Sequence, residues 1–529
     1  MATLNTEAAQ SQELAKQLWA IANDLRGNMD ASKFKNYILG TIFYRYLSER
    51  TERYMDELLK DEGGITYREA LKDEDYAPVV KEWSIEHLGY IIEPKYLYDS
   101  LIDEIRNGEF SIEHFERAIN ELTGSTIGQE SEAAFDKLFD DMNLQDKDLG
   151  KEVSDRTSLI SKVMMRIYDI NFHLDDAKFD VLGTAYMILI GLFASDAGKK
   201  GGEFFTPTCA STLLARLVTV GLEEVTSVCD PCAGSGSLLL EVKNHLTTHK
   251  VGHFYANELN GSTYNLLRMN LLMHGVPYRQ FTTFNSDALG KDPFDGCDPF
   301  QIQVSNPPYS AKWSAAPSYL DDPRFSAAGA LAPKTKADFA FLEGMVHHMA
   351  SNGRIAILLP HGVLFRGNAE LKIRRYLIDE LNVLDAVIGL PANLFHGTGI
   401  PVAVLVLKRD RNGDKDNILF IDASKYFEPG KNMNILRDED IDRIVQAYTD
   451  RKDVDKFAHV ASMQEVIDNE YNLNIPRYVD TFEPEEEIDL NEVAGEIRKL
   501  QREIKEIDAQ LKPFFEELGL DFPFDEEGK

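Results

Sequence analysis

Two short motifs near the middle of the chain combine residue types that can hold an amine and a nucleoside. Asn306-Pro307-Pro308-Tyr309 follows one apolar stretch, and Asp230-Pro231-Cys232-Ala233-Gly234-Ser235-Gly236 begins 76 residues earlier, after another. An amine conjugated to an aromatic ring is a poor nucleophile because its lone pair is delocalised. Hydrogen-bond acceptors placed around that nitrogen favour a tetrahedral geometry and free the lone pair for reaction.

Each residue of the later motif suits the binding of a planar base. The Asn306 side-chain oxygen and the Pro307 carbonyl can both accept hydrogen bonds from an NH₂ group. Pro307 and Pro308 stiffen the turn and carry no N–H groups that would compete for these acceptors. Tyr309 offers a ring for stacking, and a base in a duplex must be flipped out to reach it. A plain proline-rich loop after a strand is the alternative interpretation.

The earlier motif is typical of a tight turn between a strand and a helix. Gly234 and Gly236 allow the backbone to approach a ligand closely, and a helix beginning at Ser237 offers free N–H groups. The spacing differs from the G-x-G-x-x-G fingerprint, which disfavours a nicotinamide dinucleotide. A simple strand-to-helix connection is the alternative for this motif taken alone.

Acidic residues follow two further strands. Glu258 ends the next apolar stretch, where a carboxylate can accept both hydroxyls of a ribose, and Asp287 follows another, where it can accept a hydrogen bond from an adenine amine. Either acid alone fits a helix cap or a solvated turn. Three such strand ends in series favour a nucleoside site.

A segment upstream of both motifs, residues 202–208, places two aromatic residues beside Thr-Pro. Phe204 and Phe205 can cover an aliphatic chain of the ligand, and Thr206 with Pro207 can cap the helix that follows. By itself this segment would be interpreted as a loop with a helix cap.

Short apolar runs alternate with helical patterns from Asp180 onward, which predicts a mostly parallel, doubly wound sheet. A helix is expected from Asp180 to about Ala197. The predicted strands are Val225–Cys229, Phe254–Ala256, Ile302–Ser305, Ile355–Leu359, Val383–Ile388 and Val402–Leu407. Helical patterns cover Ser237–Leu246, Ser262–His274 and Asp338–Ala350, and the region after the last strand reads as irregular. Residues 1–165 read as helical.

Composition narrows the class of protein. The 529 residues carry a formal charge of −32, which is awkward for a chain that must grip DNA alone, because phosphate contacts need Lys and Arg. The four cysteines are scattered without metal-ligand spacing, so we expect no metal and a reducing cytoplasm. No apolar run reaches the roughly 18 residues needed to span a membrane.

Taken together, these motifs resemble the modification (methyltransferase) subunit of a type I restriction–modification system. The stretch from Asp180-Val181-Leu182-Gly183 to Gly202-Glu203-Phe204-Phe205-Thr206-Pro207 is typical of that family, whereas Asn-Pro-Pro-Tyr also occurs in methyltransferases that act on RNA guanine or protein glutamine. The resemblance covers nearly the whole chain. It implies an α/β, Rossmann-like core dependent on S-adenosylmethionine at residues 166–478, a helical domain at 1–165, and a linker with a C-terminal helix at 479–529.

The resemblance also implies a site and partners. Transfer is to the N6 amine of adenine in DNA, with Asn306, Pro307, Pro308 and Tyr309 as catalytic residues. A separate specificity subunit, bound by two modification subunits, reads the sequence, and a motor subunit can join. A protein-glutamine or RNA methyltransferase is the alternative, and intact motifs disfavour an inactive scaffold. The expected cofactor-binding residues are Glu203, Phe204, Phe205, Thr206, Pro207, Thr208, Asp230, Gly234, Ser235, Gly236, Ser237, Glu258 and Asp287.

The C-terminal helical pattern predicts a docking element. Its apolar residues follow the 4-3-4-3-4 spacing of a coiled-coil seam. The segment from Asp480 to the end has 17 acidic and 6 basic residues, so it supplies 11 of the 32 net negative charges and is a poor match for DNA. We expect it to dock on the specificity subunit, with packing on the chain's own core as the alternative. Pro513 is expected to end or kink the helix. The seam consists of Val493, Ile497, Leu500, Ile504, Ile507 and Leu511.

Overall fold

The structure is a computed structural model, and it describes residues 16–18, 20–21, 31–60, 64–170, 206–395, 398–430, 433–481 and 490–524. The chain forms two compact units, Met1–Asp480 and Thr481–Lys529. The helix predicted from Asp180 to Ala197 lies outside the described residues. Among those residues, no helix combines the length and apolarity needed to cross a membrane.

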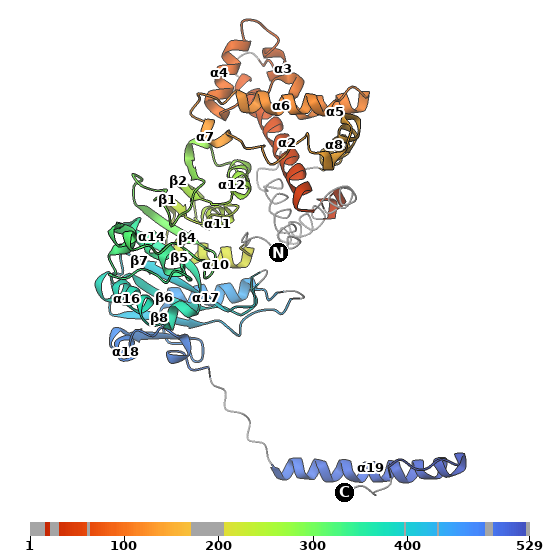
Figure 1. Ribbon diagram of the computed structural model, residues 1–529, viewed down its shortest axis with the longest axis vertical. Coiled ribbons are helices and arrows are strands. Elements are labelled where there is room, and N and C mark those ends of the chain that lie inside the picture. Colours follow the sequence, from red (N-terminus) through yellow and green to blue (C-terminus); the bar gives the residue numbers. More distant parts are fainter. Residues whose placement is uncertain are drawn as a thin grey trace. The chain divides into compact units, whose positions relative to one another are not determined.

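A nine-stranded sheet forms the centre of the larger unit, in the order β3-β2-β1-β4-β5-β7-β6-β8-β9 (Figure 1). The block from β3 to β5 is parallel throughout, β7 runs antiparallel to both of its neighbours, and β9 runs antiparallel to β8. The mostly parallel α/β sheet is thereby confirmed. The strands are β1 Glu224–Asp230, β2 Lys250–Asn257, β3 Phe281–Phe284, β4 Phe300–Ser305, β5 Met349–Pro360, β6 Leu384–Gly389, β7 Val402–Lys408, β8 Asn417–Asp422 and β9 Ala458–Ser462.

Helices cover both faces of this sheet, as its apolar strands require. Alternate residues of β5 enter different hydrophobic clusters: Ala356 and Leu358 belong to one, and Ile355, Ile357 and Leu359 to the other. Figure 1 shows α10 and α17 on one side of the strands and α14 and α16 on the other. The helices of this region are α10 Thr208–Thr219, α11 Ser237–Asn244, α12 Gly261–Met273, η3 Tyr278–Gln280, η4 Pro317–Asp321, α13 Pro323–Ser326, α14 Asp338–His347, α15 Gly362–Phe365, α16 Ala369–Arg375, η5 Tyr376–Glu380, α17 Asp438–Asp450, α18 Met463–Asp468 and η6 Ile475–Arg477.

All six strands predicted from apolar runs are present, and the three predicted helices of this region are α11, α12 and α14. The prediction of an irregular region after the last of those strands is wrong. That region contains β8, α17, β9 and α18, and β8 pairs with β6 across a long sequence separation that no local pattern reveals.

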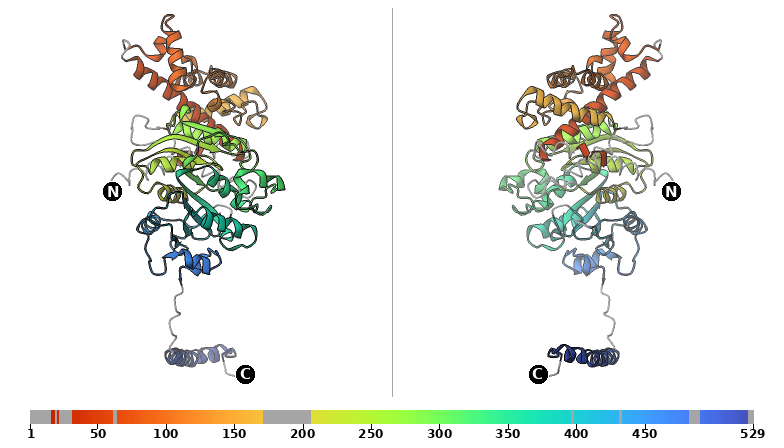
Figure 2. Two further views of the ribbon diagram at one scale, coloured as in Figure 1. Left: turned by 90° about the vertical axis from the view of Figure 1, so that its left-hand side faces the viewer. Right: turned by 90° about the vertical axis from the view of Figure 1, so that its right-hand side faces the viewer.

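The N-terminal region is helical, and no strand occurs within residues 31–60 or 64–170. Figure 2 shows these helices beside the yellow-green strands β1–β3 and away from the blue ones. Their buried residues share one hydrophobic cluster with α10, α11 and α12. The helices are α2 Ala31–Leu59, α3 Tyr67–Ala70, α4 Ala77–Leu88, η1 Pro94–Tyr96, α5 Tyr98–Asn107, α6 Ile112–Gly124, α7 Glu132–Phe135, η2 Lys147–Leu149 and α8 Val153–Tyr168.

Polar contacts fix α12 to this helical region. The Asp141 carboxylate accepts hydrogen bonds from Ser262 Oγ at 2.5 Å and Asn265 Nδ2 at 2.8 Å, near the start of α12. The buried Arg268 donates to the Ala133 carbonyl at 2.9 Å. At the far end of the helix, the Tyr46 hydroxyl donates to the Leu272 carbonyl at 2.9 Å. Both ends of α12 are therefore held from outside the sheet.

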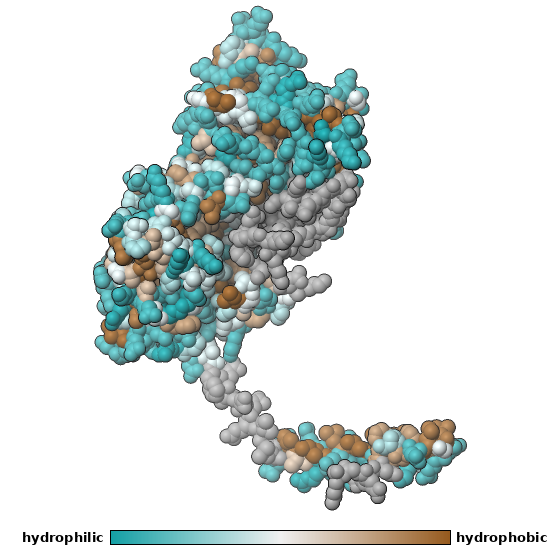
Figure 3. Space-filling view, viewed as in Figure 1, coloured by the Kyte–Doolittle hydropathy of each residue, from teal (hydrophilic) through white to brown (hydrophobic). Residues whose placement is uncertain are grey.

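Among its described residues, 481 and 490–524, the smaller unit has one helix, α19 Leu490–Leu518. The six seam residues are 37–56% exposed, and Figure 3 shows apolar side chains along one side of this helix. The helix continues through Pro513 for five more residues, so of the two expected effects of this proline, the end of the helix does not occur.

Candidate functional site

The carboxyl ends of β1, β2, β3 and β4 lie side by side because these strands are parallel neighbours. Hydrogen bonds then join the loops that follow them. Gly234 N donates to Glu258 Oε2 at 2.9 Å, which links the β1 loop to the β2 loop. Ser305 Oγ at the end of β4 donates to Asp230 Oδ1 at 2.9 Å, which links the β4 loop to β1. The predicted motifs therefore meet at one edge of the sheet.

The glycine turn after β1 leaves its backbone accessible. Gly234 has φ +54°, and a Cβ atom there would meet nothing within 4 Å, so this part of the turn faces open space. Gly236 has φ +81°, and a Cβ atom there would lie 2.6 Å from Leu267 Cδ1 on α12. Glycine is thus required at Gly236 both for conformation and for packing. The hydroxyls of Ser235 and Ser237 lie 3.0 Å apart at the start of α11.

Asp230 is fully buried at the end of β1. Its Oδ1 accepts hydrogen bonds from Cys232 N and Ser305 Oγ, both at 2.9 Å. Its Oδ2 is buried and has no hydrogen-bond partner among the described residues. Burial raises the pKa of Asp230 to about 7 against the two hydrogen bonds, and the nearby Glu258 carboxylate adds to the rise. One oxygen is thus structural, and the other is a buried acceptor in need of a donor.

A network of amides shapes the β2 loop around Glu258. Asn257 Nδ2 donates to the Pro231 carbonyl at 3.2 Å and to the Ser286 carbonyl at 3.0 Å, so it ties together the loops after β1, β2 and β3. Glu258 Oε1 accepts from Asn260 N at 2.8 Å. Beside this acid, Leu259 exposes 68% of its surface. The loop therefore presents a carboxylate and an apolar side chain together.

Asp287 lies in an exposed turn, where its Oδ1 accepts a hydrogen bond from Leu289 N at 3.0 Å. Arg324 on α13 binds the backbone carbonyls of this turn. It donates to the Ala288 carbonyl at 2.9 Å and to the Gly290 carbonyl at 2.6 Å, and its side chain is almost fully buried. Arg324 therefore anchors the backbone of this turn through two carbonyl groups.

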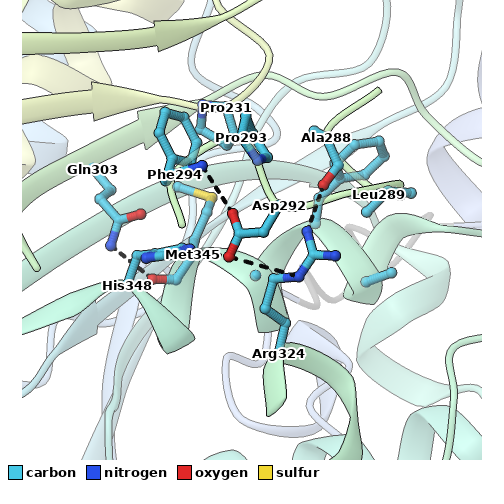
Figure 4. Close-up of a pocket in the computed structure, with 13 residues that line it drawn as sticks. Pro231, Ala288, Leu289, Asp292, Pro293, Phe294, Gln303, Arg324, Met345 and His348 are labelled. Atoms are coloured by element: carbon cyan, nitrogen blue, oxygen red, sulfur yellow. Dashed lines mark hydrogen bonds and ion pairs between the residues drawn. The ribbon is translucent and has the colours of Figure 1, made fainter. Parts of the chain in front are cut away.

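A cavity beneath this turn, lined in part by Arg324, Asp292 and His348, is too small for a cofactor (Figure 4). Its volume of about 20 Å³ is room for one water molecule. The ligand atoms of Asp292, His347 and His348 lie within 4.8 Å of one another, as a metal site would require. However, Arg324 Nε lies 3.9 Å from Asp292 Oδ2, and this fixed positive charge disfavours a divalent cation. Asp292 instead pairs with His348 Nε2 at 2.8 Å.

Two hydrogen bonds orient the Asn306 amide. Its Nδ2 donates to Thr206 Oγ1 at 3.0 Å, and its Oδ1 accepts from the Tyr309 hydroxyl at 2.7 Å. Because Nδ2 is committed to Thr206, Oδ1 is the atom presented as an acceptor. No described residue donates to the Pro307 carbonyl. The motif thus offers the two acceptors that an NH₂ group needs.

The Tyr309 ring forms one wall of this acceptor site. It packs edge-on against Phe395, with ring centroids 5.9 Å apart and an interplanar angle of 88°. Burial raises the pKa of Tyr309, and the neighbouring Asp338 adds to the rise, so the hydroxyl stays protonated and remains a donor to Asn306. The sequence predicts the ring as a stacking surface but gives no sign of this hydroxyl contact.

The segment upstream of α10 is described only in part. Glu203, Phe204 and Phe205 lie outside the described residues. The expectation that Thr206 and Pro207 cap α10 through a side chain is wrong: the N-cap is Pro207, without a side-chain hydrogen bond, and the Thr206 hydroxyl turns to Asn306 instead. Pro207 is buried and Thr208 is exposed.

Sequence reasoning missed several residues that shape the site. These residues form hydrogen bonds with segments that are distant in sequence: Asn257, Ser305 and Arg324. No local sequence pattern predicts such contacts. Leu259 was identifiable in principle, because an apolar residue directly after the strand-end acid Glu258 is unusual for a solvated turn.

Two substitutions of Tyr309 should separate its hydroxyl from its ring. Tyr309→Phe removes a hydrogen bond worth about 0.5–1.5 kcal/mol, so we expect turnover to fall by roughly 2- to 12-fold. Tyr309→Ala also removes stacking worth about 1–3 kcal/mol, so its loss should be much larger. Single-turnover methylation of DNA, the activity that the sequence resemblance implies, measures the rates of both variants. Equal losses in the two variants would show that the ring contributes nothing beyond its hydroxyl.

Comparison with known proteins identifies the family. The N-6 DNA methylase family matches residues 177–487, and the HsdM N-terminal domain family matches residues 14–167. The chain is 34% identical over 97% of its length to the type I restriction enzyme MpnII methylase subunit of Mycoplasma pneumoniae, of which it covers 97%.

A solved structure agrees with this match. The methyltransferase subunit of a type I restriction–modification system from Streptococcus thermophilus superposes with a TM-score of 0.82 at 41% identity, over 89% of this chain and 100% of that one. Both the region that contains the sheet and the helical N-terminal region are therefore matched. This chain belongs to the N-6 DNA methylase family, among the methylase subunits of type I restriction–modification systems.

Proposed function

We propose that this chain transfers a methyl group from S-adenosylmethionine to the N6 amine of an adenine flipped out of DNA. The Asn306 geometry carries the proposal. Its Oδ1 and the Pro307 carbonyl are fixed acceptors for the two hydrogens of that amine, and the Tyr309 ring is beside them for stacking. Acceptance by both oxygens draws the nitrogen toward a tetrahedral geometry with its lone pair available.

The residues at the strand ends fit the proposed cofactor. S-adenosylmethionine supplies an activated methyl group on a sulfonium and carries an ammonium, a ribose and an adenine. The unpartnered, buried Asp230 Oδ2 suits the ammonium, and Glu258 suits the ribose hydroxyls. The exposed Leu259 can cover one face of the adenine, and Asp287 can accept from its amine. Gly234, with open space beside it, allows the backbone to approach the methionine part.

The pKa of Asp230 predicts how cofactor binding depends on pH. Burial raises that pKa to about 7, and only the ionised carboxylate forms an ion pair with the ammonium. Below pH 7 binding must release a proton, so the dissociation constant should rise as pH falls, by up to about tenfold per unit. Calorimetry from pH 7.5 to 5.5, in two buffers of different ionisation enthalpy, measures both the cofactor affinity and the number of protons released on binding.

Asp230→Asn is the matched control for this experiment. It retains an oxygen that can accept from Cys232 N and Ser305 Oγ but cannot ionise. We expect weaker binding that no longer changes over this pH range. A flat profile for the unaltered chain would remove Asp230 from the cofactor site.

We further propose that the chain methylates DNA only within a complex, two copies with one specificity subunit that reads the sequence. The net charge of −32 disfavours DNA binding by this chain alone. The exposed apolar seam of α19 provides a surface for assembly. The solved relatives include a structure of complex assembly in a type I restriction–modification system, with a TM-score of 0.60 at 16% identity, which supports the fold.

The proposal is tested by co-expressing the chain with its specificity subunit in a host that lacks adenine methylation. Nucleoside mass spectrometry of the host DNA should detect N6-methyladenine, and the Asn306→Ala variant should give none. Methylation of cytosine, or of RNA or protein glutamine, would contradict the proposal. The match to the N-6 DNA methylase family and to methylase subunits of type I restriction enzymes disfavours those alternatives.

A further inference from the structure

The residue directly after the acceptor motif has an unfavourable backbone conformation. Ser310 has φ +51°, the left-handed region that non-glycine residues rarely adopt. Such a conformation costs free energy and persists only where the surroundings hold it. The holding contact is a hydrogen bond of 2.7 Å from Ser310 N to Asp338 Oδ1. The orientation of the acceptor motif thus depends on a carboxylate 28 residues away.

Asp338 is well placed to act as a fixed anchor. It is the first residue of α14, which packs against β5, and its side chain is only 1% exposed. Its other oxygen, Oδ2, lies 3.7 Å from Arg366 Nη1, and the same nitrogen donates to Glu370 Oε1 at 2.8 Å. Burial raises the pKa of Asp338, while the Ser310 N–H and Arg366 oppose the rise.

The chain between the motif and the anchor is closed by a second contact. Ala337 N donates to the Ala311 carbonyl at 2.9 Å, so the two ends of the segment 311–337 are hydrogen-bonded to each other. The acceptor motif, Asp338 and the loop that carries Arg366 therefore form a continuous polar chain from β4 through α14 to the start of α16. None of these contacts belongs to the cofactor side of the site.

We propose that Asp338 is a positioning residue for methyl transfer: by holding Ser310 N it fixes the acceptor loop, and with it the Pro307 carbonyl and the Tyr309 ring, in the orientation that accepts adenine. Arg366 supports it by balancing its charge. The inference rests on the function proposed above. It predicts that Asp338 affects the acceptor side of the reaction and leaves the cofactor side unchanged.

The test compares Asp338→Ala with Asp338→Asn and the unaltered chain. Asparagine keeps an oxygen that can accept from Ser310 N, whereas alanine does not. Glu343→Gln is the matched control, because Glu343 is a second buried acid on α14 with no hydrogen-bond partner among the described residues. Three quantities are measured: amide hydrogen exchange of the chain alone, its affinity for S-adenosylmethionine, and single-turnover methylation of adenine-unmethylated genomic DNA by the complex with the specificity subunit.

We expect Asp338→Ala to exchange faster in the amides of residues 309–313 but not within α14, and to bind S-adenosylmethionine within about twofold of normal. Its methylation rate should fall on the order of 10- to 100-fold, the usual result of a misplaced reacting group. Asp338→Asn should recover most of the slow exchange of the loop and most of the methylation rate. Glu343→Gln should match the unaltered chain in methylation rate. A normal rate for Asp338→Ala, or faster exchange throughout α14 with loss of cofactor affinity, overturns the inference.

Failure of the proposed function has a different signature. If the unaltered complex methylates no adenine, the function is wrong, whereas the exchange experiment on the chain alone still shows whether Asp338 holds the loop.

Discussion

Replacing Asn306 by alanine is expected to abolish methyl transfer while the chain remains folded and binds its cofactor. The substitution removes the Oδ1 acceptor and the contact with Thr206. Loss of one preorganised group typically lowers the rate by about 10²–10³-fold. Because this substitution also removes the Thr206 contact, we expect transfer to fall below detection. Tritium transfer from labelled S-adenosylmethionine to DNA measures the rate, and calorimetry measures the cofactor affinity, which should stay within about twofold.

A matched control and a second variant sharpen this prediction. Asn469→Ala removes a comparable amide from the end of α18, outside the predicted site, and should be fully active. Asn306→Asp keeps an acceptor but loses the donor to Thr206, so it should also be inactive. If a folded Asn306→Ala protein no longer binds the cofactor, then Asn306 belongs to the cofactor site and its assignment to the amine is wrong.

Deleting residues 491–529 should leave a folded, cofactor-binding chain that neither assembles with a specificity subunit nor methylates DNA. The larger unit ends at Asp480, so its core does not include α19. The exposed seam of α19 consists of Val, Ile and Leu side chains, and burial of each stabilises a complex by about 1.5–3 kcal/mol. Size-exclusion chromatography with the specificity subunit, followed by a methylation assay, measures the loss.

Point substitutions separate the seam from the rest of α19. Leu500→Asp with Ile504→Asp places two charges in the seam and should weaken assembly by more than about 100-fold. Gly495→Asp with Ala509→Asp places two charges of the same sign on the opposite side of the helix and should assemble normally. Assembly that survives both the deletion and the seam substitutions would show that another surface binds the partner.

The sequence was sufficient to predict that the strand ends with the proposed site residues lie together, because parallel strands bring their carboxyl ends to one edge of the sheet. It was not sufficient for the side chains that join those ends. The contact between Thr206 and Asn306 spans 100 residues, and the contact between Ser310 and Asp338 depends on a left-handed backbone. Neither leaves a local pattern, because both depend on how distant segments pack.

The elements that the sequence analysis missed differ in how strong a local signal they have. The helix α17 had a recognisable signal, since Ile441, Ile444 and Tyr448 fall at 3- and 4-residue spacing, and the prediction of an irregular region overlooked it. The strand β8 had a weaker one, because a run of six residues can be strand or loop until a partner is known. Its partner β6 precedes it in the chain, and β7 lies between the two in the sequence.

The anchoring of α12 at both ends limits how such proteins can exchange parts during evolution. A recombination event that joined the helical front end of one relative to the catalytic core of another would leave Asp141 facing a foreign α12, and Arg268 and Leu272 facing a foreign front end. An unpaired buried charge of this kind is strongly destabilising. Inheritance should therefore keep the helical N-terminal region and the sheet-containing core together as one genetic unit.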